Sequence, residues 1–342
     1  LTQAVQSRKA WQGLDQPSKQ RSTRFTQIRM VEAGTRRYLG NVLLFRSDYA
    51  GARVCYDQAL EIYREIGDRR GESGTLNNLA IVSRSQGDSA GSKVHHEQAL
   101  SIKRKTGDRW GEGASLNGLG LVSADQGDYA SARIYLEQAL RIFREMGDRQ
   151  SEGHTLNDLG LFSLCIGDYT RAKACLKQAL AIFCKVGDRW GECTALLDRS
   201  LLFYYLGDNQ AAWEHSQRAL LIAQDLGVRS CEGYALTRMG YASEGSGNLE
   251  EAEAVYRDAL VLRQELNQLN RAMEVRAGLA RVSLAQGNLT QAQVQVEEIL
   301  NYLKDQTLDG TVEPLRVYLT CYHALRANQD PRAGDILETA YS

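Results

Sequence analysis

Asparagine recurs at a fixed interval in the first half of the chain, at Asn77, Asn117 and Asn157. A side-chain amide offers both a hydrogen-bond donor and an acceptor, and the main chain of an extended peptide needs both. Three such amides at intervals of forty residues therefore suit the binding of a peptide backbone. The alternative is that an ancestral segment was duplicated and the asparagines were copied with it. Both interpretations require that the interval reflects a repeated structural element.

The chain is a tandem repeat with a period of forty residues. Glycine follows half that period, from Gly67 to Gly247, and is usually followed by aspartate. Each repeat therefore consists of two elements of equal length. The seven copies, which contain no insertion or deletion, are marked by a pair of residues: Ala59-Leu60, Ala99-Leu100, Ala139-Leu140, Ala179-Leu180, Ala219-Leu220, Ala259-Leu260 and Ile299-Leu300.

Both elements of a repeat are predicted to be helices. Glycine after the last apolar residue adopts the left-handed conformation that ends a helix, and the next aspartate accepts hydrogen bonds from the first amides of the following helix. No proline lies between Leu60 and Leu300 to break a helix, and so short a turn makes neighbouring helices antiparallel. The second element shows the helical spacing i, i+4, i+7, i+8 and i+11 in Ala132, Leu136, Ala139, Leu140 and Phe143.

This pattern resembles the tetratricopeptide repeat, a helix-turn-helix element of about 34 residues. Its small and large positions stand here at Leu116, Leu119, Gly120, Ala132, Leu136 and Ala139. The usual terminal proline is missing and each second helix is longer, which is similar to Pins-type adaptors, kinesin light chains and many bacterial signalling proteins. The resemblance implies an all-α fold, a right-handed α-α superhelix of about seven repeats with degenerate ends.

The repeat pattern divides the chain into an array and two ends. Residues 28–327 form the predicted array. Residues 1–27 lack the pattern and are basic; they are interpreted as a degenerate helix, a cap or a linker, with a nucleic-acid-binding arm as the sharper alternative. Residues 328–342 are predicted to be a truncated helix or cap, and Pro314 is expected to interrupt the last first helix. Because the chain begins at Leu1, we expect a fragment of a longer protein.

The resemblance implies that the first helices of the repeats line a concave groove that binds a partner, and that asparagines there clamp the peptide main chain. Arg37, Arg84 and Arg281 are suited to hold a carboxylate or phosphate. The aliphatic and tyrosine positions form a candidate apolar floor, unless neighbouring helices pack tightly enough to bury them. The predicted peptide-binding or partner-binding residues are Arg37, Asn41, Asn77, Arg84, Asn117, Leu121, Asn157, Leu161, Leu201, Tyr204, Tyr241 and Arg281.

Three motifs that suggest other chemistry fail on their spacing or context. Residues 87–93 look faintly like a phosphate loop, but the preceding segment is a predicted helix and the spacing is wrong. The run 95–97, His-His-Glu, lacks the i, i+4 histidines of a zinc helix, and the glycosylation-like triplet 288–290 lies in an inter-helix turn. No acid, base and nucleophile set converges. The chain is therefore predicted not to be an enzyme and to need neither a metal nor a cofactor.

Composition narrows the classes of partner and the compartment. The net charge of −1 argues against binding to nucleic acid or to a membrane surface, because phosphate binding needs a clustered positive face. No apolar run is long enough to span a bilayer, and no signal peptide is visible. Seven cysteines without a Cys-x-x-Cys pair predict reduced, largely packed thiols in a cytoplasmic protein. A redox or metal role for the group from Cys165 to Cys193 is the alternative.

Two functional hypotheses follow. The first is a non-catalytic protein-protein interaction module that binds an extended peptide or partner segment in the groove and acts as a scaffold or adaptor. The second is the ligand-sensing or protein-sensing part of a bacterial signal-transduction ATPase of the STAND class, whose long arrays this chain resembles. In that case a nucleotide-binding domain would lie upstream in the same full-length chain, because no phosphate loop is present here.

Overall fold

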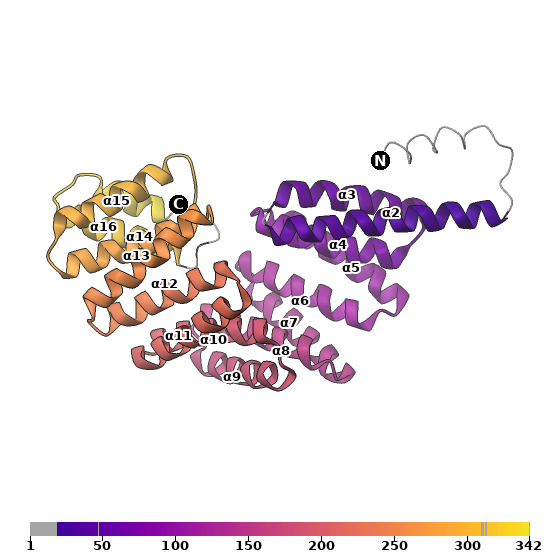
Figure 1. Cartoon of the computed structure of the whole chain (residues 1–342), viewed down its shortest axis with the longest axis horizontal. Helices are drawn as coiled ribbons and strands as arrows, with labels where there is room; N and C mark the ends of the chain where they lie inside the picture. Colours follow the sequence, from indigo (N-terminus) through magenta and orange to yellow (C-terminus); the bar gives the residue numbers. More distant parts are fainter. Residues whose placement is uncertain (1–18, 47, 309–310, 312, 342) are drawn as a thin grey trace. The chain divides into compact units, whose positions relative to one another are not determined.

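The computed structural model describes residues 19–46, 48–308, 311 and 313–341, and every regular element in them is an α-helix. The all-α prediction is confirmed. The helices belong to two compact units, Leu1–Asp128 (unit 1) and Tyr129–Ser342 (unit 2). Within each unit, helices that follow one another in the chain pack against each other (Figure 1).

The described helices alternate between the first helix of a repeat, with an even label, and the second, with an odd label. Unit 1 contains α2 (Lys19–Phe45), α3 (Tyr49–Ile66), α4 (Arg69–Ser85), α5 (Ser89–Thr106) and α6 (Arg109–Asp125). Unit 2 contains α7 (Tyr129–Met146), α8 (Arg149–Cys165), α9 (Tyr169–Val186), α10 (Arg189–Tyr205), α11 (Asn209–Leu226), α12 (Arg229–Gly245), α13 (Leu249–Glu265), α14 (Leu269–Ala285), α15 (Leu289–Leu303), α16 (Pro314–Ala327) and α17 (Ala333–Tyr341).

The Gly-Asp pairs end one helix and begin the next, as predicted. Gly67 closes α3 with a φ of 73°, in the left-handed region that glycine adopts easily. Asp68 then caps α4, because its carboxylate accepts a hydrogen bond of 2.9 Å from the amide of Gly71. Asn267, which replaces the spaced glycine, also has a positive φ of 53°, a conformation that asparagine tolerates better than most residues. The turn geometry therefore persists where the sequence pattern fades.

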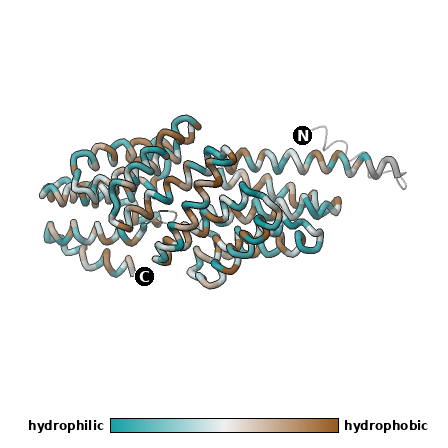
Figure 2. Tube along the Cα trace, turned by 90° about the horizontal axis from the view of Figure 1, so that it is seen from below, coloured by the Kyte–Doolittle hydropathy of each residue, from teal (hydrophilic) through white to brown (hydrophobic). Residues whose placement is uncertain are grey.

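The core lies between the helices, and small residues allow them to approach closely. In unit 1, a Cβ added at Gly40 of α2 would lie 2.5 Å from the ring of Tyr56 on α3. In unit 2, one added at Gly240 of α12 would lie 2.3 Å from the ring of Tyr256 on α13. Both tyrosines are fully buried. Hydrophobic and hydrophilic residues are interspersed along the helices (Figure 2), which is typical of amphipathic helices in an array.

A recurrent ion-pair cluster lies at the starts of α4, α6, α8 and α10. The predicted i, i+3 contact is present, with Arg109 bonded to Glu112 at 2.7 Å and its equivalent Arg69 bonded to Glu72 at 2.6 Å. A second arginine reaches the same carboxylate from the preceding helix, since Arg104 lies 2.9 Å from Glu112. Each of these glutamates is therefore shared between two successive helices.

The two ends differ in detail from the predicted boundaries. Helix α2 begins at Lys19, so the expected boundary between residues 27 and 28 falls inside one continuous helix, while the interpretations of residues 1–18 lie outside the described residues. Pro314 was expected to interrupt a helix, and that prediction is wrong. It is the first residue of α16, where the absence of an N–H costs nothing because that position has no intrahelical acceptor.

None of the helices in the described part of the chain combines the length and apolar character that crossing a membrane requires.

Candidate functional site

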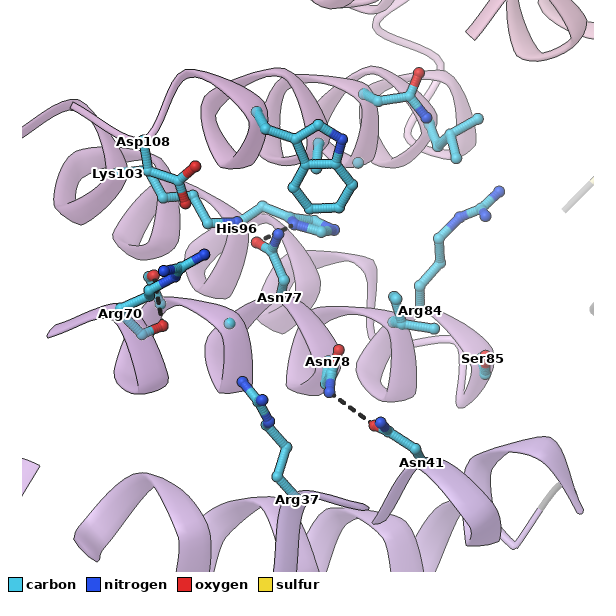
Figure 3. A pocket seen from close by; sticks show the side chains of 18 residues that line it. Arg37, Asn41, Arg70, Asn77, Asn78, Arg84, Ser85, His96, Lys103 and Asp108 are labelled. Atoms are coloured by element: carbon cyan, nitrogen blue, oxygen red, sulfur yellow. Dashed lines mark hydrogen bonds between the residues drawn. The ribbon is translucent and has the colours of Figure 1, made fainter. Parts of the chain in front are cut away.

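Six of the twelve predicted site residues line one pocket in unit 1. The pocket has a volume of about 640 Å³ and lies among α2, α4, α5 and α6. Its full lining consists of Arg37, Asn41, Arg70, Ser73, Gly74, Asn77, Asn78, Ile81, Arg84, Ser85, His96, Lys103, Asp108, Trp110, Ala114, Asn117, Gly118 and Leu121 (Figure 3). We call this set the unit 1 pocket. Most of its lining comes from first helices, as the family resemblance implied.

Asn77 lies in the wall of the unit 1 pocket and is partly committed to its own chain. Its Oδ1 accepts a hydrogen bond of 3.0 Å from the hydroxyl of Ser115 and lies 3.3 Å from Nδ1 of His96. In the described part of the chain its amide nitrogen makes no hydrogen bond, so both N–H groups stay available to a ligand. Asn77 can therefore donate to a peptide carbonyl, but its acceptor is already used.

A second amide pair lies on the other side of the pocket. Nδ2 of Asn78 donates to Oδ1 of Asn41 at 3.0 Å, and the same oxygen accepts a bond of 2.8 Å from the hydroxyl of Tyr56. Figure 3 shows this pair reaching between α2 and α4. Asn41 was predicted as a site residue, whereas Asn78 was not. The prediction followed the asparagines that recur every forty residues, and among these two neighbours only Asn77 belongs to that series.

The lining is mainly positive. Among the described lining residues, the cations Arg37, Arg70, Arg84 and Lys103 face a single carboxylate, that of Asp108. Arg84 is held from within unit 1, because its guanidinium bonds Asp125 at 2.5 and 3.1 Å. The remaining positive charge makes the pocket suited to an anionic or carbonyl-rich ligand.

Lys103 and His96 enter the pocket from the core side of α5, and the sequence reasoning did not select them. Lys103 is 3% exposed, and its burial lowers the pKa of the ammonium group to about 8. Burial also lowers the pKa of His96, to about 3, so the imidazole is neutral at physiological pH. The sequence does contain a signal for both residues. The next two repeats have phenylalanine at the position of Lys103 and leucine at the position of His96, so a polar residue at either position is a departure from the repeat.

The predicted residues of unit 2 mostly face other helices. Nδ2 of Asn157 donates to Asp198 at 2.7 Å, and its side chain is buried. Leu201 and Tyr241 are also buried, with 3% and 1% exposure, while Leu161 and Tyr204 pack against the cluster that contains Leu201. Leu201, a member of the predicted apolar floor, is thus not open but covered, which agrees with the alternative that neighbouring helices bury these positions, and Tyr241 is covered as well.

Arg281 also has a partner within unit 2. Its guanidinium donates to Glu244 at 2.6 and 2.9 Å and to Thr320 at 3.2 Å. Arg316 of α16 lies over the ring of Tyr241, 4.5 Å from its centroid, and over that of Tyr204 at 5.1 Å. Tyr204, Tyr241 and Arg281 are thereby joined, through Arg316 and Glu244, into a network made by the chain itself.

None of the seven cysteines, all of which are described, forms a disulfide, and they are less uniformly packed than predicted. Cys175, Cys193, Cys231 and Cys321 are buried, whereas Cys165 and Cys184 are exposed. Within the described residues, no group of three His, Cys, Asp or Glu side chains is placed to hold a metal ion.

Sequence comparison identifies the family. Models of the tetratricopeptide repeat match residues 32–105, 72–145 and 111–185, and a further one matches residues 234–266. The matched segments together make up more than half of the chain. The chain belongs to the tetratricopeptide repeat family. No curated protein matches this tetratricopeptide repeat chain.

Solved structures share the fold of this tetratricopeptide array at low sequence identity. A signal-transduction ATPase with numerous domains and a tetratricopeptide repeat sensor, from Pyrococcus horikoshii, is similar with a TM-score of 0.63 and 15% identity over 90% of this chain. This chain spans 47% of that ATPase. A Rap protein complexed with competence and sporulation factor gives a TM-score of 0.65 at 18% identity, covering 80% of this chain and 75% of its own.

A third similar structure is the aspartyl phosphate phosphatase F from Bacillus subtilis, with a TM-score of 0.66 and 16% identity, covering 86% of this chain and 78% of its own. At these identities the likeness shows the tetratricopeptide solenoid fold and nothing finer.

Proposed function

We propose that this chain is a non-catalytic interaction module that binds an extended segment of a protein partner in the unit 1 pocket, and so acts as a scaffold or adaptor. The observation that carries the proposal is the gathering of Arg37, Asn41, Asn77, Arg84, Asn117 and Leu121 around that one pocket. They come from three successive first helices, so a bound segment would contact three repeats at the same time.

The chemistry of the lining supports a main-chain ligand. Amides from α2, α4 and α6 stand beside the cationic side chains of Arg37 and Arg70, and amide N–H groups are the donors that peptide carbonyls need. Ile81 and Leu121 add apolar contact on the same lining. A peptide held by main-chain bonds would receive affinity from the amides and specificity from the charges and these two side chains.

The proposal assigns binding to unit 1, and so to Asn77 and Asn117 but not to Asn157. Asn157 donates its amide to the partly buried Asp198, and Arg281 is bonded to Glu244. These side chains are proposed to stabilise the repeats, and Leu161, Leu201, Tyr204 and Tyr241 are proposed to pack between them. The module is proposed to be cytoplasmic, which is supported by cysteines that form no disulfide.

The test is selection of ligands from a displayed library of random peptides with the purified chain, followed by affinity measurement on variants. The double variant Asn77→Ala with Asn117→Ala should weaken the selected peptides by about fivefold to a hundredfold, since each lost hydrogen bond is worth about 0.5–1.5 kcal/mol. Calorimetry or fluorescence anisotropy would measure the loss.

The matched control is Gln98→Ala, because Gln98 is an exposed side chain of α5 and does not line the pocket. It should leave affinity and melting temperature unchanged, and the double variant should stay folded at the assay temperature although it loses the bond from Ser115 to Asn77. Equal binding by the wild type and the double variant would mean that the asparagines are copies without a binding role.

The alternative proposal is the sensor part of a larger switch protein. Its support is the similarity to the Pyrococcus horikoshii ATPase, which carries such a sensor and covers 90% of this chain. On this proposal the pocket would bind an inducer, and a nucleotide-binding domain would precede the array. The full reading frame decides between the two: a nucleotide-binding domain upstream favours the sensor, and a start codon close to Leu1 favours the adaptor.

A further inference from the structure

An arginine replaces a core residue in α10. In the other repeats from α4 to α14, the residues equivalent to Arg199 are all buried and apolar: Leu79, Leu119, Leu159, Met239 and Leu279. One turn further along α10, Phe203 stands where the same repeats have a serine: Ser83, Ser123, Ser163, Ser243 and Ser283. Copying explains why repeats agree, but it does not explain why this repeat places a cation and a phenyl ring here.

Arg199 is poorly satisfied by its own chain. Among the described residues its guanidinium makes one hydrogen bond, to Nε2 of His215 at 3.3 Å, and its Nε is buried without a partner. Burial lowers the pKa of Arg199, and no carboxylate of the described chain raises it. Because arginine stays charged in a protein, the fold holds a partly buried positive charge without a counter-ion among these residues.

His215 does not supply the missing negative charge. Arginine can only donate, so Nε2 of His215 accepts the bond and the ring is neutral. Burial and the charge of Arg199 lower the pKa of His215 to about 4, although Glu214 and Asp208 act in the opposite direction. Both carboxylates have other partners, since Glu214 accepts from Gln210 at 2.9 Å and Asp208 caps α11.

A second cation reaches the same phenyl ring. Nζ of Lys173 on α9 lies 5.8 Å from the centroid of Phe203, and the guanidinium carbon of Arg199 lies 5.5 Å from it. The imidazole of His215 is stacked on this ring, with the centroids 5.1 Å apart. Lys173 is exposed and forms no salt bridge in the described part of the chain. We call these four residues the α10 cation cluster; Figure 1 shows α9, α10 and α11, which carry it, next to one another.

The equivalent place in unit 1 shows what this cluster lacks. Arg53, which corresponds to Lys173, donates to Oγ of Ser83 at 2.9 Å and to Oε1 of Gln86 at 3.1 Å. Unit 2 has Phe203 in place of that serine and a leucine in place of that glutamine. The acceptors that hold the cation in unit 1 are therefore replaced by apolar side chains, and a second cation is added.

We propose that the α10 cation cluster is an anion site that takes the phosphate group of a monoester, with Arg199 and Lys173 as its charged ligands. It lies outside the unit 1 pocket, and it is a second binding site beyond the proposed function. The planar guanidinium of Arg199 suits two oxygens of one phosphate. The flexible stem of Lys173 lets its ammonium group turn toward the same phosphate.

A phosphate monoester matches the charge of the cluster better than a carboxylate does. It carries about −1.5 to −2 charges at pH 7 and three strong acceptor oxygens, against the two positive charges of Arg199 and Lys173. A carboxylate brings one negative charge and would balance only one of the two cations. Two sources carry the phosphate group: a phosphorylated side chain of a protein partner, and a small phosphate metabolite.

The experiment compares the two sources on the full chain. The ligands are N-acetyl-alanyl-phosphoseryl-alanine amide and adenosine monophosphate, with the unphosphorylated peptide and adenosine as controls. The chain is labelled with carbon-13 in its histidine rings, and NMR titrations are run in about 0.15 M salt, which screens weak attraction to surface charges.

The histidine rings show where each ligand binds. The resonance of His215, identified by its loss in His215→Asn, should shift and saturate with the phosphorylated ligands but not with the controls. His96 lines the unit 1 pocket and reports binding there separately. The phosphorylated ligand that moves His215 at the lower concentration identifies the source of the phosphate.

Arg199→Leu restores the residue of the preceding repeat, Leu159, and should fold. It should bind the phosphorylated ligands about tenfold to a hundredfold more weakly, because it removes the charged hydrogen bonds of one guanidinium. Arg199→Lys keeps the charge without the planar fork and should retain part of the affinity.

Lys173→Met tests the site at an exposed residue, where folding is not at risk, and should weaken binding about twofold to fivefold. The matched control is Arg133→Met, because Arg133 is the exposed equivalent of Lys173 one repeat earlier and belongs to the same unit. It should leave the affinity unchanged.

Three outcomes would overturn the inference. The His215 resonance could stay in place with both phosphorylated ligands, or move equally with the unphosphorylated controls. Arg199→Leu could bind as tightly as the wild type. A phosphopeptide that moves His96 alone would be bound in the unit 1 pocket, which contradicts a second site. None of these results touches the binding of displayed peptides in the unit 1 pocket, so the two proposals fail separately.

Discussion

Arg281 of α14 donates two hydrogen bonds to Glu244 of α12, from Nε to Oε1 at 2.6 Å and from a terminal nitrogen to Oε2 at 2.9 Å. Arg316 of α16 lies 3.4 Å from the same carboxylate, and the hydroxyl of Tyr256 donates to it at 2.7 Å. Arg281 was predicted to hold the carboxylate of a ligand. The carboxylate it holds belongs to the preceding repeat of its own chain, and together with Arg316 the pair joins three successive first helices of unit 2.

Glu244→Ala should destabilise unit 2 strongly. Burial on its own raises the pKa of Glu244, but the hydrogen bonds and charges of Arg281 and Arg316 outweigh it and leave the pKa below its ordinary value. Removing the carboxylate takes the counter-ion from the partly buried Arg281 and leaves Arg316 with Glu313 alone, which lowers the free energy of unfolding by about 3–5 kcal/mol. Urea denaturation followed by circular dichroism measures the loss.

The control for this prediction is Glu265→Ala. Glu265 pairs with Arg229 at the surface, with about half of each side chain exposed, and such pairs contribute about 0–1 kcal/mol. The wild type should also lose the contribution of Glu244 as pH falls, because protonation of a carboxylate with a lowered pKa removes its stabilisation. A loss no larger for Glu244→Ala than for Glu265→Ala would contradict the proposed structural role of the network.

Asp198 should make the free energy of unfolding depend on pH in the opposite direction to Glu244. Burial raises the pKa of its carboxyl to about 6, despite the hydrogen bond from Asn157 and the charge of Arg238. Between about pH 4 and 6 the folded chain therefore binds more protons than the unfolded one, so this group's contribution to stability falls as pH rises through that window. Asp198→Asn stays neutral and can still accept from Asn157, and it should be more stable than the wild type above pH 6 by about 1–3 kcal/mol.

The difference between the two proteins should vanish below about pH 4, where both side chains are uncharged. Thermal melts of wild type and Asp198→Asn at pH 4 and at pH 7.5 provide the comparison. Asp225→Asn is a suitable control, because Asp225 is an exposed aspartate of the same unit. A wild type more stable than Asp198→Asn at pH 7.5 would show that the charged carboxylate is favoured in the folded state.

The sequence predicted the helices and turns well because their causes are local. A left-handed glycine and a capping aspartate act within four residues, as Gly67 and Asp68 show, and the apolar spacing sets the buried face of each helix by itself. Even Asn267, outside the glycine pattern, adopts the expected left-handed conformation. Period and chemistry along the chain therefore sufficed for the fold.

The candidate site was only partly predictable, because exposure depends on residues far along the chain. Equal repeat positions have unequal surroundings: Asn77 lines a pocket, whereas Asn157 is buried against Asp198. Tyr241 is covered in part by Arg316 of α16. The two residues are far apart in the sequence, so no local pattern predicts this contact. Lys103 could have been found from the sequence, by asking where a repeat departs from its neighbours rather than where it agrees with them.

The capping aspartates offer a final prediction, since the array contains its own control. Asp168 caps α9 by accepting a hydrogen bond of 3.0 Å from the amide of Arg171. Asn248 holds the equivalent place before α13 but makes no such side-chain bond. Asp168→Ala should therefore lower the free energy of unfolding by about 0.5–2 kcal/mol, whereas Asn248→Ala should change it by less than about 0.5 kcal/mol. Both positions lie in unit 2 and precede second helices, so urea denaturation compares them directly. Equal losses would mean that the backbone of the turn, and not the aspartate side chain, starts these helices.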